Sequence, residues 1–361
     1  MSWPTWLPLR ADLQPLTPYG APQIPAEAAL NTNENPYPPS PAMQQAISDA
    51  VARVSGTLNR YPDRDANELR AQLALYINEG SDTRFNVKNI WAANGSNEII
   101  QSIFLAFGAG SALGFIPSYS MHPLIAKVAR TSWVDGNRNL DFTFNLQMAS
   151  GEIKKHKPTL TFITTPNNPT GDAIVFSDIA ALAEVVSLQG GLLIVDEAYA
   201  EFSSEKSAVT LIAQNPHVIV IRTMSKAFAF AGARVGYLIA DPVVVDAMQL
   251  VRLPYHLSAL TQAAAVVALQ YRAELLGSVA CLIAARESLV IALNALGLST
   301  VPSSANFILF TGFRSSAPQL WQGLLDKGVL IRDVGLSAYL RVTIGNEAEN
   351  KAFLNALTEL L

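Results

Sequence analysis

Short apolar runs alternate with helical patterns through the middle of the chain. Between the runs, apolar residues recur at helical spacing, as at Ile100, Ile103, Phe104 and Phe107. Strands that are apolar on both faces and separated by helices are typical of a mainly parallel sheet. The pattern therefore predicts an α/β domain. The runs are, in order, "NIWAA", "SALGFIP", "TLTFITT", "GLLIVDEAY", "HVIVIRTMSK" and "GARVGYLIA".

The pattern changes towards both ends of the chain. The first 40 residues are rich in Pro and Asn, which favours an extended arm because proline lacks a backbone donor and biases its predecessor away from helix. A long helical pattern over 261–297 is followed by short strands and helices, as in a small α+β domain. We expect an N-terminal arm (1–40) that packs on the small domain, a large domain (41–260) and the small domain itself (261–361).

Composition narrows the functional classes. The chain has 361 residues, and half of them are hydrophobic. Its net charge of −4 does not provide the excess of positive charge that attracts nucleic acid. The apolar runs are shorter than the ~20 residues that a membrane-spanning helix needs. Cys281 is the single cysteine, lies in an apolar helical pattern, and is expected to be a core thiol in a reducing compartment. We therefore expect a cytoplasmic protein without nucleic-acid or membrane partners.

Polar groups follow four of the apolar runs where each run ends. Because the carboxyl ends of parallel strands meet at one edge of a sheet, these groups are expected to share a crevice. Each has a plainer explanation when taken alone, since Asn-Gly and Asn-Pro form turns, aspartate caps helices and lysine reaches solvent along its stem. The groups are Asn94 to Glu98, Asn167 to Gly171, then Asp196, Glu197 and Tyr199, and finally Arg222, Thr223, Ser225, Lys226 and Arg234.

Their chemistry suits one ligand in particular. The turn "NGSNE" leads into a helix, whose first N–H groups form an anion site, but it lacks the spacing and lysine of a nucleotide-binding P-loop. Asp196 would hold a proton on an aromatic nitrogen, and Lys226 would form a Schiff base. Phosphate, protonated pyridine and lysine together describe pyridoxal phosphate. No spacing of His, Cys, Asp or Glu residues indicates a metal site.

Motifs spread over nearly the whole chain carry a family resemblance. The sequence resembles the aspartate aminotransferase-like, fold-type I pyridoxal-phosphate enzymes, and most closely their histidinol-phosphate aminotransferase group. This resemblance implies a large domain with a mainly parallel seven-stranded sheet flanked by helices, beside a smaller α+β domain and an extended arm. The motifs are "LTPYGAPQ", "LNTNENP", "RYPD", "ANGSNEII", "PSYSMHP", "PNNPTG", "VDEAYAEF", "RTMSKAFAFAGARVGY", "RLPYHLS", "ANFILF", "IRDVG" and "YLRVTIG".

The resemblance also implies roles around the cofactor. Lys226 would bind it covalently, Asp196 would pair with the pyridine N–H, and Tyr119 would stack on the ring. Asn168 and Tyr199 would hydrogen-bond the ring oxygen. The cofactor phosphate would be held by Gly95, Ser96, Asn97, Thr223, Ser225 and Arg234, with Tyr61 reaching it from the other subunit of a homodimer.

The substrate would lie further out in the crevice. The resemblance implies that Arg341 binds a substrate anion together with Arg332, Tyr19 and Asn33. The expected reaction is transamination between histidinol phosphate and 2-oxoglutarate, which in histidine biosynthesis runs from imidazole-acetol phosphate and glutamate.

Three other functions remain open from the residues. An aromatic amino-acid aminotransferase uses nearly the same scaffold and is the first alternative. A pyridoxal-phosphate decarboxylase acting on a phosphorylated amino acid is the second. A transcription regulator built on this fold would carry a fused DNA-binding module, for which the chain has neither spare length nor a basic patch.

Overall fold

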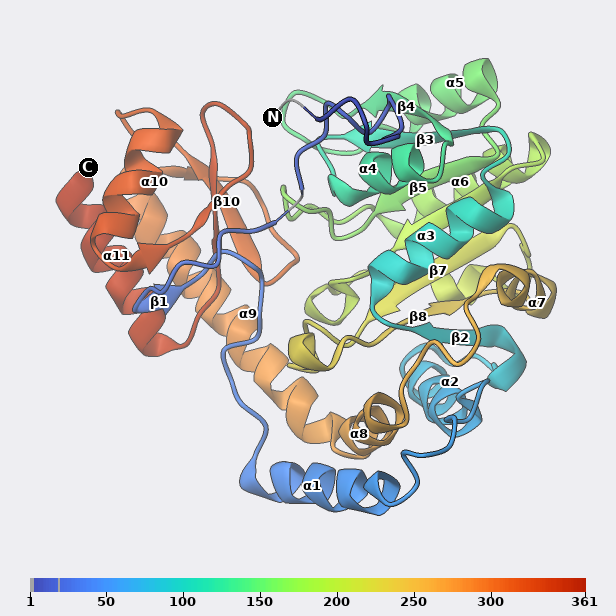
Figure 1. Cartoon of the computed structure of the whole chain (residues 1–361). Coiled ribbons are helices and arrows are strands. Elements are labelled where there is room, and N and C mark those ends of the chain that lie inside the picture. The colour runs from blue at the N-terminus through green and yellow to red at the C-terminus, as the bar shows by residue number, and fades with distance from the viewer. Residues whose placement is uncertain (1–2, 19) are drawn as a thin grey trace.

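The largest sheet of the computed structural model, which describes residues 3–18 and 20–361, has seven strands in the order β2-β8-β7-β6-β5-β3-β4 (Figure 1). Neighbouring strands are parallel except where β8 pairs with β2 and β7. The predicted mainly parallel seven-stranded sheet is confirmed. Its strands are β2 (Ile90–Ala93), β3 (Ser111–Ile116), β4 (Ser132–Asn137), β5 (Leu160–Thr164), β6 (Leu192–Asp196), β7 (Val218–Thr223) and β8 (Gly236–Ile239).

Helices cover both faces of this sheet because its strands are apolar on both. Along β7, Val218 and Val220 join one buried cluster, whereas Ile219 and Ile221 join the other. Residues of α3, α4 and α7 contribute to the second cluster, and those of α2, α5, α6 and α8 to the first. The helices are α1 (Pro41–Ser55), α2 (Asn67–Ser81), α3 (Ser96–Phe107), α4 (Met121–Val128), α5 (Leu146–His156), α6 (Phe176–Leu188), α7 (Pro242–Val251) and α8 (Ala259–Gln270), with short 3-10 turns η1 (Val87–Asn89), η2 (Ala200–Phe202), η3 (Ala208–Leu211) and η4 (Ala231–Ala233).

The C-terminal part contains a second sheet with helices packed against it, as an α+β unit should. Four antiparallel strands lie in the order β12-β13-β10-β9, and a separate parallel pair joins β1 to β11. The elements are β1 (Ala28–Ala29), α9 (Arg272–Ala295), β9 (Ser299–Thr300), β10 (Phe307–Thr311), α10 (Ala317–Asp326), β11 (Val329–Leu330), β12 (Arg332–Asp333), β13 (Leu340–Thr343) and α11 (Glu347–Leu360).

The long helical pattern over 261–297 is divided at Tyr271 into α8 and α9. In Figure 1, α8 lies beside α1, whereas α9 runs diagonally to the C-terminal sheet. By length and composition α9 is apolar enough to cross a membrane, contrary to expectation, but its buried residues, among them Leu282 and Leu289, form one face that packs in the protein core. Cys281 lies on the opposite face and is exposed, so the predicted core thiol is wrong.

The N-terminal arm contacts both parts of the molecule. Near its start, the Arg10 guanidinium donates to the carbonyl oxygens of Val128 and Lys127, at 3.0 and 3.3 Å, at the C-terminus of α4. Further along, β1 pairs with β11 (Figure 1). Between these contacts, Ala21 lines a cavity at the carboxyl edge of the large sheet. The domain boundaries at residues 40 and 260 stay predictions.

Candidate active site

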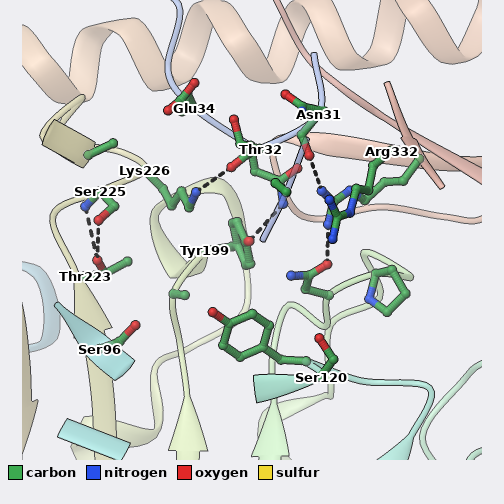
Figure 2. A pocket seen from close by; sticks show the side chains of 18 of the residues that line it. Asn31, Thr32, Glu34, Ser96, Ser120, Tyr199, Thr223, Ser225, Lys226 and Arg332 are labelled. Carbon is green, nitrogen blue, oxygen red and sulfur yellow. Dashed lines mark hydrogen bonds between the residues drawn. The ribbon is translucent and has the colours of Figure 1, made fainter. Parts of the chain in front are cut away.

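A cavity of about 510 Å³ opens at the carboxyl ends of the parallel strands, between the large sheet, the C-terminal sheet and the segment that follows β1 (Figure 2). This is the edge where the polar ends of the apolar runs were expected to meet. Most of the predicted site residues line it, and they come from three regions of the sequence.

Lys226 lies in this cavity just beyond β7. Its Nζ donates to the carbonyl oxygen of Thr32 at 2.8 Å (Figure 2). Burial lowers the pKa of Lys226 to about 8, an effect that Arg341 and Arg234 strengthen and Glu34 opposes. More of the amine is therefore neutral and nucleophilic near pH 7 than in an exposed lysine.

Asp196 ends β6 with its carboxylate almost fully buried. Oδ1 accepts from the backbone N–H of Ala198 at 3.2 Å, and Oδ2 lies 3.1 Å from Nε2 of His122, which is also buried. A buried carboxylate needs such partners to offset its desolvation.

His122 was not among the predicted site residues. No local pattern identifies it; the turn before α4 brings it beside Tyr119, whose carbonyl oxygen accepts from the His122 backbone N–H at 3.2 Å. The two rings meet edge to face, with centroids 5.4 Å apart.

A chain of hydrogen bonds orients Tyr199. Its hydroxyl accepts from Nδ2 of Asn33 at 2.9 Å. Thr343 holds Asn33 in turn, donating to Oδ1 at 3.1 Å and accepting from the Asn33 backbone N–H at 3.0 Å. Side chains from the large domain, the arm and β13 thus fix one phenol beside Lys226.

The predicted phosphate-binding residues meet at the N-terminus of α3. Gly95 precedes this helix with φ +87°, and a Cβ there would lie 2.6 Å from Nη2 of Arg234. Arg234 Nη1 is 3.4 Å from the Ser225 hydroxyl, which accepts from Thr223 at 3.0 Å. The side chains of Ser96, Asn97, Thr223, Ser225 and Arg234 line the cavity around the first N–H groups of α3, an arrangement suited to a dianion.

Two arginines stand opposite one another on neighbouring strands. Arg332 of β12 pairs with Arg341 of β13, and both line the cavity. Arg341 donates to Oδ1 of Asn168 at 2.5 Å and to the carbonyl oxygen of Asn31 at 2.7 Å. Like charges directly opposite in a sheet are destabilising, so this pair favours an anion between them.

The three predicted tyrosines of the site differ in position. Tyr119 lines the cavity and donates to Oδ1 of Asn97 at 3.2 Å. Tyr61 is 78% exposed, stacks on Tyr255 with ring centroids 4.2 Å apart, and does not line the cavity of its own chain. Tyr19 lies outside the described residues.

Comparison with known proteins identifies the family. Residues 27–357 match the family described as "Aminotransferase class I and II". Over 97% of this chain and 95% of the relative, the sequence is 54% identical to "Histidinol-phosphate aminotransferase" of Mycolicibacterium vanbaalenii. The chain belongs to the histidinol-phosphate aminotransferase family.

Solved structures agree on the fold of this aminotransferase. A histidinol-phosphate aminotransferase from Sinorhizobium meliloti, in complex with pyridoxal-5'-phosphate, superposes with a TM-score of 0.85 at 22% identity, over 98% of this chain and 97% of that one. A putative histidinol-phosphate aminotransferase from Erwinia carotovora atroseptica reaches 0.83 at 26% identity, over 94% and 98%. The resemblance stated from the motifs is confirmed.

The contact between His122 and Asp196 yields a first prediction. His122→Leu removes a hydrogen bond to a charged group, about 1.5–3 kcal/mol, so we expect this aminotransferase to bind pyridoxal phosphate roughly ten- to a hundredfold more weakly. Equilibrium titration of cofactor absorbance measures this. His156→Leu, at a half-buried histidine beside Glu152 that does not line the cavity, serves as the control, and equal affinity in both variants would contradict the role of His122.

The lowered pKa of Lys226 yields a second prediction. Only the neutral amine reacts with pyridoxal phosphate, so the rate at which cofactor-free enzyme takes up cofactor should rise with pH through about 8. Glu34→Gln removes a charge that raises this pKa, and the midpoint should move to lower pH. Stopped-flow absorbance over a pH series measures it, with Asp49→Asn on α1 as a remote control. A midpoint unchanged or higher in Glu34→Gln would refute the argument.

Proposed function

We propose that this enzyme transfers an amino group between histidinol phosphate and 2-oxoglutarate, with pyridoxal phosphate as its cofactor. In histidine biosynthesis the net reaction makes histidinol phosphate from imidazole-acetol phosphate and glutamate. The observation that carries the proposal is the arginine pair, Arg332 and Arg341, on the wall of the cavity that holds Lys226 and Asp196.

The residues fit the cofactor at its phosphate end. At Gly95 there is no room for a Cβ beside Arg234, and the first turn of α3 begins immediately after it. Backbone N–H groups, the hydroxyls of Thr223 and Ser225, and the Arg234 guanidinium together match the three acceptor oxygens and the charge of a phosphate.

The ring would lie between Tyr119 and the strand ends. Asp196, which contacts His122, would hold a proton on the pyridine nitrogen, and Tyr199 and Asn168 would hydrogen-bond the ring oxygen. Tyr119, whose hydroxyl donates to Asn97, would cover one face of the ring.

Lys226 carries out the proton transfers. Bound pyridoxal phosphate supplies an electron sink for the electron pair left on the substrate carbon that bears the amine. The Lys226 amine removes the proton from that carbon, and the neutral form needed for this step is favoured by its lowered pKa. The buried Asp196 carboxylate would favour the protonated, positively charged pyridine nitrogen, and that positive charge would offset the negative charge that develops on the substrate carbon.

The arginine pair explains how one site accepts two different acids. Histidinol phosphate ends in a phosphate and 2-oxoglutarate in a carboxylate, and a guanidinium binds either through two parallel hydrogen bonds. Arg341 is pre-oriented by Asn168 and Asn31, while Arg332 faces it across the strand pair. Asn33, which Thr343 of the same strand holds, donates to the Tyr199 hydroxyl.

The other candidate functions are less well supported. Curated relatives at 51–54% identity over nearly the full length carry the name histidinol-phosphate aminotransferase, which does not favour the aromatic amino-acid alternative. The decarboxylase and the regulator are weaker alternatives for the same reason.

The enzyme acts as a homodimer with shared sites. Tyr61 faces away from its own cavity, stacked on Tyr255, and exposed apolar side chains surround this stretch, among them Leu58 and Leu253. An exposed aromatic and apolar surface of this kind is typical of a subunit interface. Tyr61 then reaches the cofactor phosphate of the partner subunit. The single free cysteine suits a cytoplasmic location.

Substrate choice tests the proposed function. We expect kcat/KM with 2-oxoglutarate as acceptor to be higher for histidinol phosphate than for phenylalanine or tyrosine. Arg332→Ala should lower it for histidinol phosphate by roughly a hundredfold, the scale of a lost bidentate ion pair, and much less for phenylalanine. Steady-state kinetics on the three donors measure both. A preference for phenylalanine or tyrosine by several decades would favour the aromatic alternative.

Subunit mixing tests the shared site. Lys226→Ala and Tyr61→Ala should each be nearly inactive alone, because one lacks the amine and the other a phosphate contact. A hybrid dimer regains one intact site, so random pairing restores about a quarter of the wild-type sites. Activity after co-refolding an equal mixture measures this, and mixing Lys226→Ala with Asp196→Ala is the control that restores none. No recovery with Tyr61→Ala would contradict a contribution from the partner.

A further inference from the structure

The loop 165–172, which carries Asn168, is backed by an ion pair that the proposed mechanism does not use. Nη1 of Arg138, at the end of β4, lies 2.7 Å from Oδ2 of Asp172 and also donates to the carbonyl oxygen of Phe142 at 3.1 Å. The side chains are 1% and 12% exposed. A guanidinium is thus buried behind the active-site loop.

Hydrogen bonds connect this ion pair to the residue beside Asn168. Asp172 Oδ1 accepts from the Thr170 hydroxyl, which accepts from Nδ2 of Asn167 at 2.8 Å. Asn167 Nδ2 also donates to the carbonyl oxygen of Pro117 at 2.9 Å, and Oδ1 accepts from Ser118 at the same distance. Asn167 and Asp172, which Thr170 links, are therefore tied to the residues that follow β3 and β4.

The front of the loop contacts the C-terminal part of the chain. The Asn168 side chain accepts from Arg341, and the carbonyl oxygen of Gly171 accepts from the Ser304 backbone N–H at 2.8 Å. Gly171 has φ +89°, and a Cβ there would lie 2.4 Å from the Ser303 hydroxyl. The loop has no room to shift towards the small domain without breaking these contacts.

Stability alone does not require a buried ion pair here. Replacing a buried pair by apolar side chains of similar volume is often neutral or stabilising, whereas an ion pair fixes the direction of each hydrogen bond. We propose that Arg138 and Asp172 are positioning residues that hold Asn168 against Arg341 and the cofactor ring, and so set the affinity for the acid substrates. This inference rests on the roles proposed for Asn168 and Arg341.

A double-mutant cycle with Asn168 tests it. Asp172→Asn keeps the shape and removes the charge, and we expect KM for glutamate to rise about tenfold, the scale of one weakened charge-assisted hydrogen bond, with a smaller change in kcat. The pH midpoint of the bound cofactor's visible absorbance should shift in the direction in which Asn168→Ala shifts it. In the Asn168→Ala background, Asp172→Asn should then change neither quantity further.

A matched control separates positioning from stability. Glu79→Gln breaks the ion pair with Arg272, far from the cavity, and should change neither KM nor the midpoint. Thr170→Val, which cuts the same chain of hydrogen bonds, gives the same test if Asp172→Asn does not fold.

Two results would overturn the proposal. One is a lower melting temperature in both loop variants with wild-type KM and midpoint. The other is that the effects of Asp172→Asn and Asn168→Ala on KM and on the midpoint are fully additive in the double variant. If the wild-type enzyme does not turn over histidinol phosphate, the proposed function is contradicted instead. The double-mutant cycle, measured by the pH midpoint of cofactor absorbance, would still test the positioning role.

Discussion

The Arg341 guanidinium joins the three parts of the molecule at one point. It projects from β13, donates to Asn168 on the large domain, and donates to the Asn31 carbonyl oxygen on the arm. Its carbon also lies 5.0 Å from the ring centroid of Phe307. A planar, permanently charged fork holds several acceptors in fixed directions, which a lysine cannot do. The cavity has its shape because these segments are held together across it.

Positive charge concentrated in a buried cavity explains much of the site's chemistry. Arg332 and Arg341 face one another, Arg234 lies at the phosphate end, and Lys226 stands between them. Burial and the neighbouring guanidiniums lower the pKa of Lys226, so the arrangement both attracts anions and activates the amine. Two of the arginines proposed to bind the ligands, Arg341 and Arg234, therefore also lower the pKa of the lysine.

The polar ends of the strands are divided between two sides of the sheet. Asp196 contacts His122 at the cavity, whereas its neighbour Glu197 lies 2.8 Å from Arg222 on the other side and accepts from Ser207. Successive side chains of a strand point to opposite faces, so two adjacent acids acquire separate partners. One acid is available to a ligand, and the other belongs to a buried network that supports the loop after β6.

The sequence by itself determined the mainly parallel α/β core, the family and the identity of most residues around the cavity, because strand periodicity and short motifs are local properties. The number of strands came from the family resemblance, since β4 is not among the six apolar runs. It also placed Lys226, Asp196 and Arg234 at strand ends, which parallel topology brings to one edge. Tertiary structure alone decided the rest. The helical pattern over 261–297 has no Pro or Gly where it divides, at Tyr271, and it leaves Cys281 exposed, because packing selects which face of a helix is buried. His122 beside Asp196, and Arg138 behind the Asn168 loop, depend on distances between segments far apart in the chain, which no local pattern encodes.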